Sequence, residues 1–165
     1  LRLHDLSHAR DARPVRPDHD RKGMSAETTF NTDLTSTEDL EAGLWPLCEK
    51  LASKARQDGV ASRTVILKLR RPDFKIVTRR QTLAEPVQTA RGLFAAGRDL
   101  LKPELGRPYR LIGIGLADVQ EAAEAPSALF DTAEARTLKT ETAIDALRAR
   151  FGKAAVVAGR TLKSP

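Results

Sequence analysis

Two runs of alternating residues, separated by a short turn, constrain the fold more than any other feature of the sequence. Residues 61–71 carry apolar side chains at every second position over much of their length, with threonine, lysine and arginine between them. Turn residues follow at 72–74, and residues 74–83 return with a similar pattern. A period of two is typical of a strand with one buried face. The sequence therefore predicts a β-hairpin over residues 61–83.

The segments around this hairpin predict two helices and two further strands. Apolar residues recur every three or four positions in 35–59 and in 85–106, with Pro86 in the first turn of the second helix. Residues 23–31 and 108–119 resemble strands. The predicted fold is α+β in the order β-α-β-β-α-β, with two helices on one face of a four-stranded sheet. The other face is left for solvent or a partner.

Three details of the helix predicted at 35–59 bear on its ends and its core. Thr35 and Glu38 have the spacing of a capping box. Pro46 lies in the interior, where a proline costs about 3 kcal/mol and bends a helix, so one bent helix and two short helices are both compatible with the pattern. Cys48 lies on the apolar side with no histidine near it in sequence, which indicates a buried thiol and no nucleophile.

The composition changes at both ends of the predicted domain, which spans 22–119. Residues 1–21 are polar and contain two prolines, which favours an extended tether. Residues 120–139 are acidic and rich in alanine, which predicts a flexible linker. Residues 140–165 form a tail with a short helix. No methionine begins the chain, and we interpret it as a piece of a longer protein.

The tail has two short segments of predicted structure. Residues 140–152 predict an amphipathic helix, and residues 153–162 are compatible with a short strand. The helix would carry three apolar residues on one side, Ile144, Leu147 and Phe151. So few apolar side chains cannot form a separate core.

Charge favours a polyanionic partner. The net charge is +6, and residues 62–81 hold seven lysines and arginines against one acid, Asp73. Aromatic residues make up only 4%, so bases of a single strand have no stacking platform and a duplex backbone is the better ligand. No membrane span or signal peptide is evident, and the single cysteine fits a reducing compartment. We expect a cytoplasmic, monomeric chain.

Catalytic and metal-binding patterns are absent from the sequence. His4 and His8 have the spacing of one helical turn but no third ligand nearby. Gly113 and Gly115 do not open a helix in a βαβ unit, so they predict close strand packing or a bulge and no dinucleotide loop. We therefore expect no catalytic residue, no metal site and no cofactor in this chain.

Three segments together carry a resemblance to a known family. They are RKGMSAETTFNTDL, SRTVILKLRRPDFKIVTRRQTL and YRLIGIGLADV. From about residue 10 to about residue 119 the chain resembles the C-terminal part of the bacterial Y-family DNA polymerases of the DNA polymerase IV type. Gly23 and Met24 depart from that pattern, where relatives usually carry serine and a β-branched residue.

The resemblance implies a role and a location for each part of the chain. Residues 22–119 would be the little finger domain, whose sheet lies in the major groove of the template–primer duplex. Residues 1–21 would be the end of the thumb and the tether. The whole enzyme would extend primers past damaged template bases, with Mg²⁺ held by carboxylates of a palm domain. The palm and fingers lie outside this sequence, so the chain alone should not polymerise DNA.

The resemblance also implies positions that contact DNA phosphates. They are Lys22, Ser25, Arg63, Thr64, Thr78, Arg79, Arg80, Thr82 and Arg110. Because neighbouring side chains alternate across a strand, only one of Arg79 and Arg80 should face DNA unless the strand bulges. Leu129 and Phe130 resemble the peptide with which such polymerases bind the sliding clamp, although a proline stands at the usual glutamine.

Two other function classes remain open. The basic face could bind an acidic protein, such as the clamp or another replication factor, and competition by duplex DNA separates the two readings. The chain could also be an enzyme in its own right, which the missing acid cluster disfavours.

Overall fold

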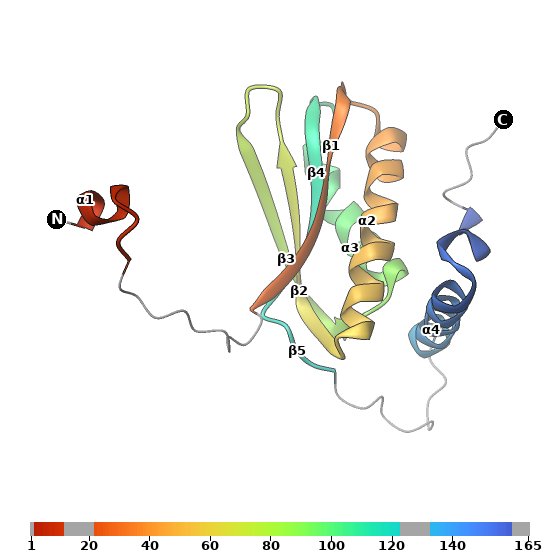
Figure 1. Cartoon of the computed structure of the whole chain (residues 1–165). Helices are drawn as coiled ribbons and strands as arrows, with labels where there is room; N and C mark the ends of the chain where they lie inside the picture. Colours follow the sequence, from red (N-terminus) through yellow and green to blue (C-terminus); the bar gives the residue numbers. More distant parts are fainter. Residues whose placement is uncertain (1, 12–21, 123–132, 160–165) are drawn as a thin grey trace.

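The computed structural model describes residues 2–11, 22–122 and 133–159 (Figure 1). The elements are α1 (Arg2–Ser7), β1 (Gly23–Leu34), α2 (Thr37–Gln57), β2 (Val60–Arg70), β3 (Ile76–Val87), α3 (Ala90–Leu101), η1 (Lys102–Glu104), β4 (Tyr109–Ala117), β5 (Gln120–Glu121), α4 (Ala133–Phe151) and η2 (Lys153–Ala155). The predicted α+β fold and its β-α-β-β-α-β order are confirmed. The two-residue strand β5, which pairs with β2, was not predicted.

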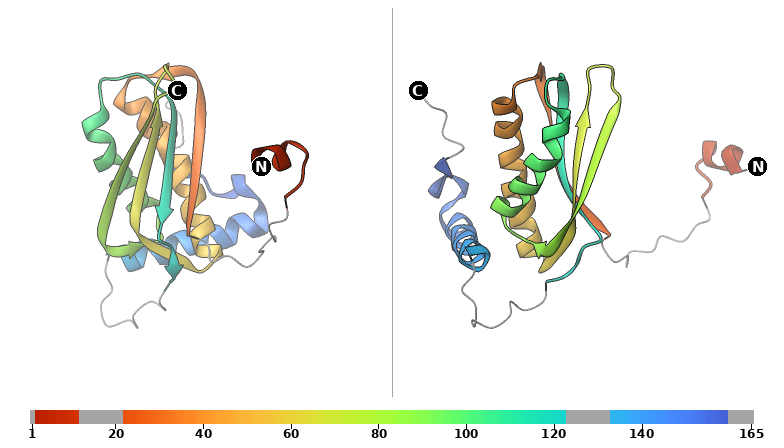
Figure 2. Two further views of the ribbon diagram at one scale, coloured as in Figure 1. Left: turned by 90° about the vertical axis from the view of Figure 1, so that its left-hand side faces the viewer. Right: turned by 180° about the vertical axis from the view of Figure 1, so that it is seen from behind.

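The sheet is antiparallel throughout and has the strand order β1-β4-β2-β3. The last long strand in sequence, β4, therefore lies between β1 and β2. Helices α2 and α3 pack on one face of this sheet, and α4 lies outside them as a further layer (Figures 1 and 2). Of the helices that the structure describes, none covers the other face, which we call the open face.

Strand alternation builds the core beneath α2 and α3. Val65, Leu67 and Leu69 of β2 are fully buried, whereas Ile66 and Lys68 between them are partly exposed. Burial of each such leucine or valine stabilises the fold by about 1.5–3 kcal/mol. The predicted alternation of the first hairpin strand is confirmed, and it fixes which side of the sheet faces the helices.

Helix α2 is a single continuous helix that begins one residue later than the capping box predicted. Its N-cap is Ser36, whose hydroxyl oxygen accepts a hydrogen bond from the Asp39 N–H at 3.0 Å, in place of the predicted pair Thr35 and Glu38. Pro46 lies inside the helix without dividing it. Leu44 and Leu47, which are buried on either side of Pro46, offset the cost of the missing backbone hydrogen bond.

The predicted start of the second helix is wrong. Pro86 belongs to the end of β3, and α3 begins only after its N-cap Thr89, whose hydroxyl accepts from the Gly92 N–H at 3.0 Å. The β2–β3 register shifts between Ser62 and Thr64, which indicates a bulge in the stretch of β3 that contains Pro86. An edge strand with a bulge tolerates proline because no ladder partner needs its missing N–H.

The C-terminal helix is longer than the sequence indicated. α4 begins at Ala133, so residues 133–139, predicted as linker, are helical. Residues 153–155 form a 3₁₀ turn, and no strand occurs within the described part of 153–162. The interpretation of 1–21 as the thumb end and tether stays a prediction, and within it Arg2–Ser7 is a short helix.

Polar contacts hold α4 against the other helices. None of its residues is buried, and the predicted apolar side exposes Leu147 and Phe151. Arg56 of α2, whose side chain is only 10% exposed, binds Glu141 at 2.6 Å and Asp145 at 2.8 Å. Glu141 also accepts from the backbone N–H of Ala90 at 2.8 Å, so α4 contributes to the N-terminal cap of α3.

Candidate nucleic-acid interface

The strand register assigns side chains to the open face. Residues directly opposite each other in an antiparallel pair point to the same side. Gly113 pairs with Lys68 and with Glu27, and Thr78 pairs with Lys68. The same register places the following residues on the open face: Ser25, Glu27 and Thr29 of β1; Gly113, Gly115 and Ala117 of β4; Thr64, Ile66 and Lys68 of β2; Thr78, Arg80 and Thr82 of β3.

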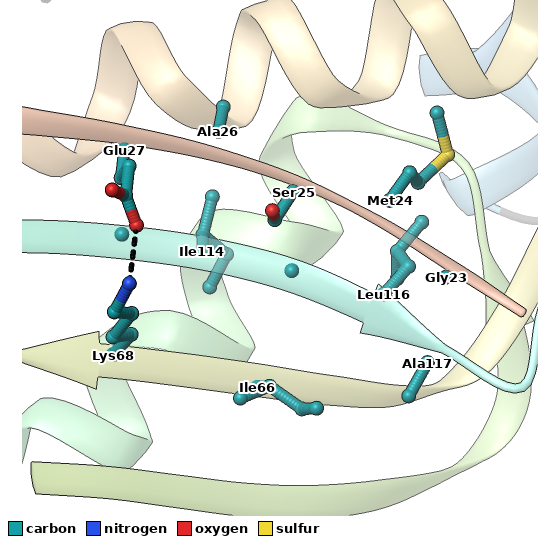
Figure 3. Close-up of a pocket in the computed structure, with 12 residues that line it drawn as sticks. Gly23, Met24, Ser25, Ala26, Glu27, Ile66, Lys68, Ile114, Leu116 and Ala117 are labelled. Carbon is teal, nitrogen blue, oxygen red and sulfur yellow. Dashed lines mark hydrogen bonds and ion pairs between the residues drawn. The ribbon is translucent and has the colours of Figure 1, made fainter. Parts of the chain in front are cut away.

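The centre of the open face is a shallow hollow of about 360 Å³ above β4. Figure 3 shows its lining residues, with Ser25 and Glu27 on one side and Ile66 and Lys68 on the other. A Cβ at Gly113 would lie 2.9 Å from the Glu27 Cβ, so β1 and β4 pack too closely there for a side chain. The predicted close packing at Gly113 is confirmed, and Gly113 and Gly115 are buried between their neighbouring strands.

The register separates the two neighbouring arginines of β3. Arg80 is opposite Ile66 on the open face, and its guanidinium binds Asp118 at 2.7 Å. Arg79 is opposite the buried Leu67, on the side of the sheet that the helices cover.

Arg79 binds a buried carboxylate at the end of α3. Its partner is Glu104, which is 1% exposed and also accepts hydrogen bonds from Arg107 at 3.2 Å and from the Tyr109 hydroxyl at 2.8 Å. Burial raises the pKa of Glu104, but the bonds from Tyr109, Arg79 and Arg107 outweigh burial and hold the pKa below its ordinary value. Burial and the bond to Glu104 raise the pKa of Tyr109. Arg79 therefore has a structural role at the edge of β3.

Arg110 lies near the tip of the hairpin. Leu34 and Tyr109 pair and pack toward the core, and the β1–β4 register shifts between Thr29 and Leu34, so alternation along β4 does not place Arg110 on the open face. Arg110 Nε lies 3.4 Å from Asp33 Oδ1, and its guanidinium lies 5.3 Å from the ring centroid of the exposed Phe74. Arg110 is therefore a cation at the hairpin end of the sheet, beside the open face.

Acids that were not predicted from the sequence pair with these cations. Lys68 binds Glu27 at 2.8 Å across Gly113. Two further ion pairs join Asp118 to Arg80 and Asp33 to Arg110. The alternation of β1 placed Glu27 on its polar side together with Ser25, which was an available signal. Asp33 and Asp118 could not be matched to their partners because the strand order was unknown.

The remaining predicted positions lie at the margins or outside the described residues. Lys22 and Ser25 are exposed at the start of β1. Thr64 belongs to the open face by register but is itself buried. Arg63 points away from the open face, and its Nε donates to the Leu83 carbonyl at 3.0 Å. Leu129 and Phe130, predicted to bind the clamp, lie outside the described residues.

Other reactive groups in the described ranges do not form a site. Cys48 is fully buried, as predicted, and burial raises the pKa of its thiol to about 12. No three His, Cys, Asp or Glu side chains there are grouped so that they could hold a metal ion. None of the described helices is both long enough and apolar enough to cross a bilayer.

The sequence of this domain matches a known family. Residues 21–129 match the family model described as the impB/mucB/samB family C-terminal domain. Because the match covers more than half of the 165 residues, the chain belongs to this family.

Its relatives include proteins named DNA polymerase IV. That of Caulobacter vibrioides is 60% identical over 164 residues, which are 99% of this chain and 41% of the relative. DNA polymerase IV 1 of Mesorhizobium japonicum is 44% identical over 162 residues, which are 97% of this chain and 37% of the relative. The chain thus spans about two fifths of the length of these relatives.

One solved structure is a more distant match. It is described as a complex of the beta-clamp processivity factor and the little finger domain of PolIV. It is 22% identical to this chain, with a TM-score of 0.48, and covers 65% of this chain and 97% of that one.

Proposed function

We propose that the open face binds the sugar–phosphate backbone of duplex DNA, as the little finger domain of a DNA polymerase IV. The single observation that carries this proposal is the asymmetry of the sheet. One face is covered by α2 and α3, and the bare face gathers hydroxyl and basic side chains on either side of β4, whose Gly113 and Gly115 carry no side chain there. Guanidinium, ammonium and hydroxyl groups are the usual donors to phosphate oxygens.

Five of the proposed contacts lie on the open face by register, namely Ser25, Lys68, Thr78, Arg80 and Thr82. We add Lys22, which is exposed directly before β1, and Arg110, which lies at the hairpin end of the sheet. The proposed contacts do not include Arg79 and Arg63, because both lie off the open face. They also do not include Thr64, because its side chain is buried.

Replacing Arg80 by alanine should weaken duplex binding about equally on any sequence. Loss of one phosphate contact should also lower the slope of log Kd against log salt by roughly one. The measurement is a fluorescence anisotropy titration of a labelled duplex at two salt concentrations. Unchanged affinity and slope would remove Arg80 from the interface.

Arg98→Ala is the matched control for Arg80→Ala. Arg98 lies on α3, is 49% exposed where Arg80 is 57% exposed, and is also paired with one acid, Glu41. Both variants lose the same charge, so a difference between them reports the face of the sheet and not net charge. Equal weakening by both would contradict a localised interface.

We also propose that the whole protein is a DNA-directed DNA polymerase that bypasses damaged template bases in the cytoplasm. The family and its relatives support this activity. In such an enzyme Mg²⁺ would act as a Lewis acid that stabilises the negative charge developing on the phosphate oxygens during nucleotidyl transfer. The described residues of this chain do not fit a Mg²⁺ site.

A primer-extension assay tests whether polymerase activity lies outside this chain, in the rest of the protein. The chain alone, supplied with primer–template, Mg²⁺ and nucleotides, should extend no primer, because it offers no grouped carboxylates in its described ranges. Measurable incorporation that survives further purification would contradict the proposal that catalysis lies elsewhere in the protein.

A further inference from the structure

We propose that three acids on and beside the open face act as built-in counterions that limit how tightly this face binds duplex DNA. This rests on the proposed function and adds a limit on the affinity for DNA. The ion pairs are Glu27 with Lys68, Asp33 with Arg110, and Asp118 with Arg80. Every acid comes from a different part of the sheet than its cation, so the pairing is a property of the folded face.

The geometry allows these pairs to open. The N–O distances are 2.8 Å for Lys68, 3.4 Å for Arg110 and 2.7 Å for Arg80. The side chains of all six residues are between 31% and 70% exposed, so either partner can rehydrate when the pair separates. An exposed pair of this kind changes an equilibrium by roughly 1.5- to 5-fold.

A phosphate that approaches one of these cations meets a carboxylate already bound to it. Binding then requires either displacement of the carboxylate or a position beside it, where two negative charges repel each other. Neutralising the acid removes both penalties and leaves the cation in place. The acids therefore weaken the affinity of this face for DNA. Removing an acid should strengthen binding, whereas removing a residue that binds phosphate should weaken it.

Three conservative variants test the inference, Glu27→Gln, Asp33→Asn and Asp118→Asn. Asn at position 118 suits the backbone, because Asp118 has a φ of 51° and asparagine also tolerates the left-handed region. Each variant should bind a labelled duplex about 2- to 5-fold more tightly, and the triple variant at least about 10-fold more tightly. The slope of log Kd against log salt should become steeper.

Glu41→Gln is the control for net charge. Glu41 binds Arg98 at 2.5 Å on the helical side, so this variant gains the same single positive charge away from the open face. It should tighten binding less than about twofold, since distant exposed charges are screened. Thermal melts of all variants establish that each is folded before binding is compared.

The outcomes separate this inference from the proposed function. If the wild type binds duplex DNA in a salt-dependent manner but the three variants bind no more tightly, only the inference is wrong. Equal tightening by Glu41→Gln would reduce the effect to net charge and also overturn it. If neither the wild type nor any variant binds duplex DNA, the proposed function itself fails, and the inference with it.

Discussion

Replacing Glu104 by alanine should lower the free energy of unfolding by about 2–3 kcal/mol. Glu104 is 1% exposed and accepts hydrogen bonds from Arg79, Arg107 and Tyr109. The variant removes the charge that links β3, η1 and the start of β4. The loss stays below that of a fully buried pair, because Arg79 and Arg107 are about half exposed and can rehydrate. Urea denaturation followed by Trp45 fluorescence measures the change.

The same carboxylate makes stability depend on pH. The pKa of Glu104 is lowered in the folded chain, so its contribution is present above the unfolded value of about 4.3 and is lost as pH falls through the lower folded value. Glutamine at position 104 has no proton to gain. The stability difference between wild type and Glu104→Gln should therefore be largest near pH 7 and should shrink below about pH 4.3.

Two comparisons decide whether Glu104 acts through Arg79. Arg79→Ala should destabilise the wild type more than it destabilises Glu104→Ala, as expected for directly bound partners. Glu41→Gln, which weakens a partly exposed pair with Arg98, should cost less than about 1 kcal/mol. If Arg79→Ala leaves stability unchanged and weakens DNA binding instead, the structural assignment of Arg79 is wrong.

Binding of duplex DNA should weaken about a hundredfold between 50 and 200 mM salt. Four basic side chains of the proposed interface can contact phosphates, Lys22, Lys68, Arg80 and Arg110. Each phosphate neutralised contributes a slope of roughly −0.9 in log affinity against log salt, because condensed counterions are released. Titration of the same labelled duplex across this range gives the slope directly.

Two further ligands test the nature of the interface. A duplex of unrelated sequence should bind within about twofold, because the proposed contacts are made to the backbone. A single strand of equal length should bind more weakly, since the open face offers no aromatic residue except Phe74 at the hairpin tip. Strong preference for one duplex sequence, or an affinity independent of salt, would contradict backbone recognition.

The asymmetry of the sheet was predictable from the sequence because alternation is a local property. Val65, Leu67 and Leu69 define one side of β2 whatever the strand order, and two helices suffice for only one face. The burial of Cys48 followed from the same kind of argument on α2. Local rules failed where tertiary structure decided the outcome. Pro86 suits a helical first turn and a bulged edge strand equally well, and only the pairing of β3 distinguishes them.

The details of the interface depend on contacts between distant segments. Asp118 and Arg80 are 38 residues apart, and Asp33 and Arg110 are 77 apart, so their pairing requires the strand order. Whether Arg79 or Arg80 faces outward requires the register of β3. The helical stretch 133–139 has a composition typical of a linker, and the charges of α4 dock it against Arg56. Sequence composition carries no information about such a docking partner.

The central place of β4 has a consequence for how the chain acquires its structure. Among the strands that the structure describes, β1 pairs only with β4, which begins 75 residues after β1 ends. During synthesis, β1 therefore emerges long before β4, the strand that forms hydrogen bonds with its backbone N–H and C=O groups. In contrast, β2 and β3 can pair at once across a short turn. Contacts this distant in sequence slow folding. We expect the hairpin to be an early element, with completion of the domain waiting until residue 117 has left the ribosome.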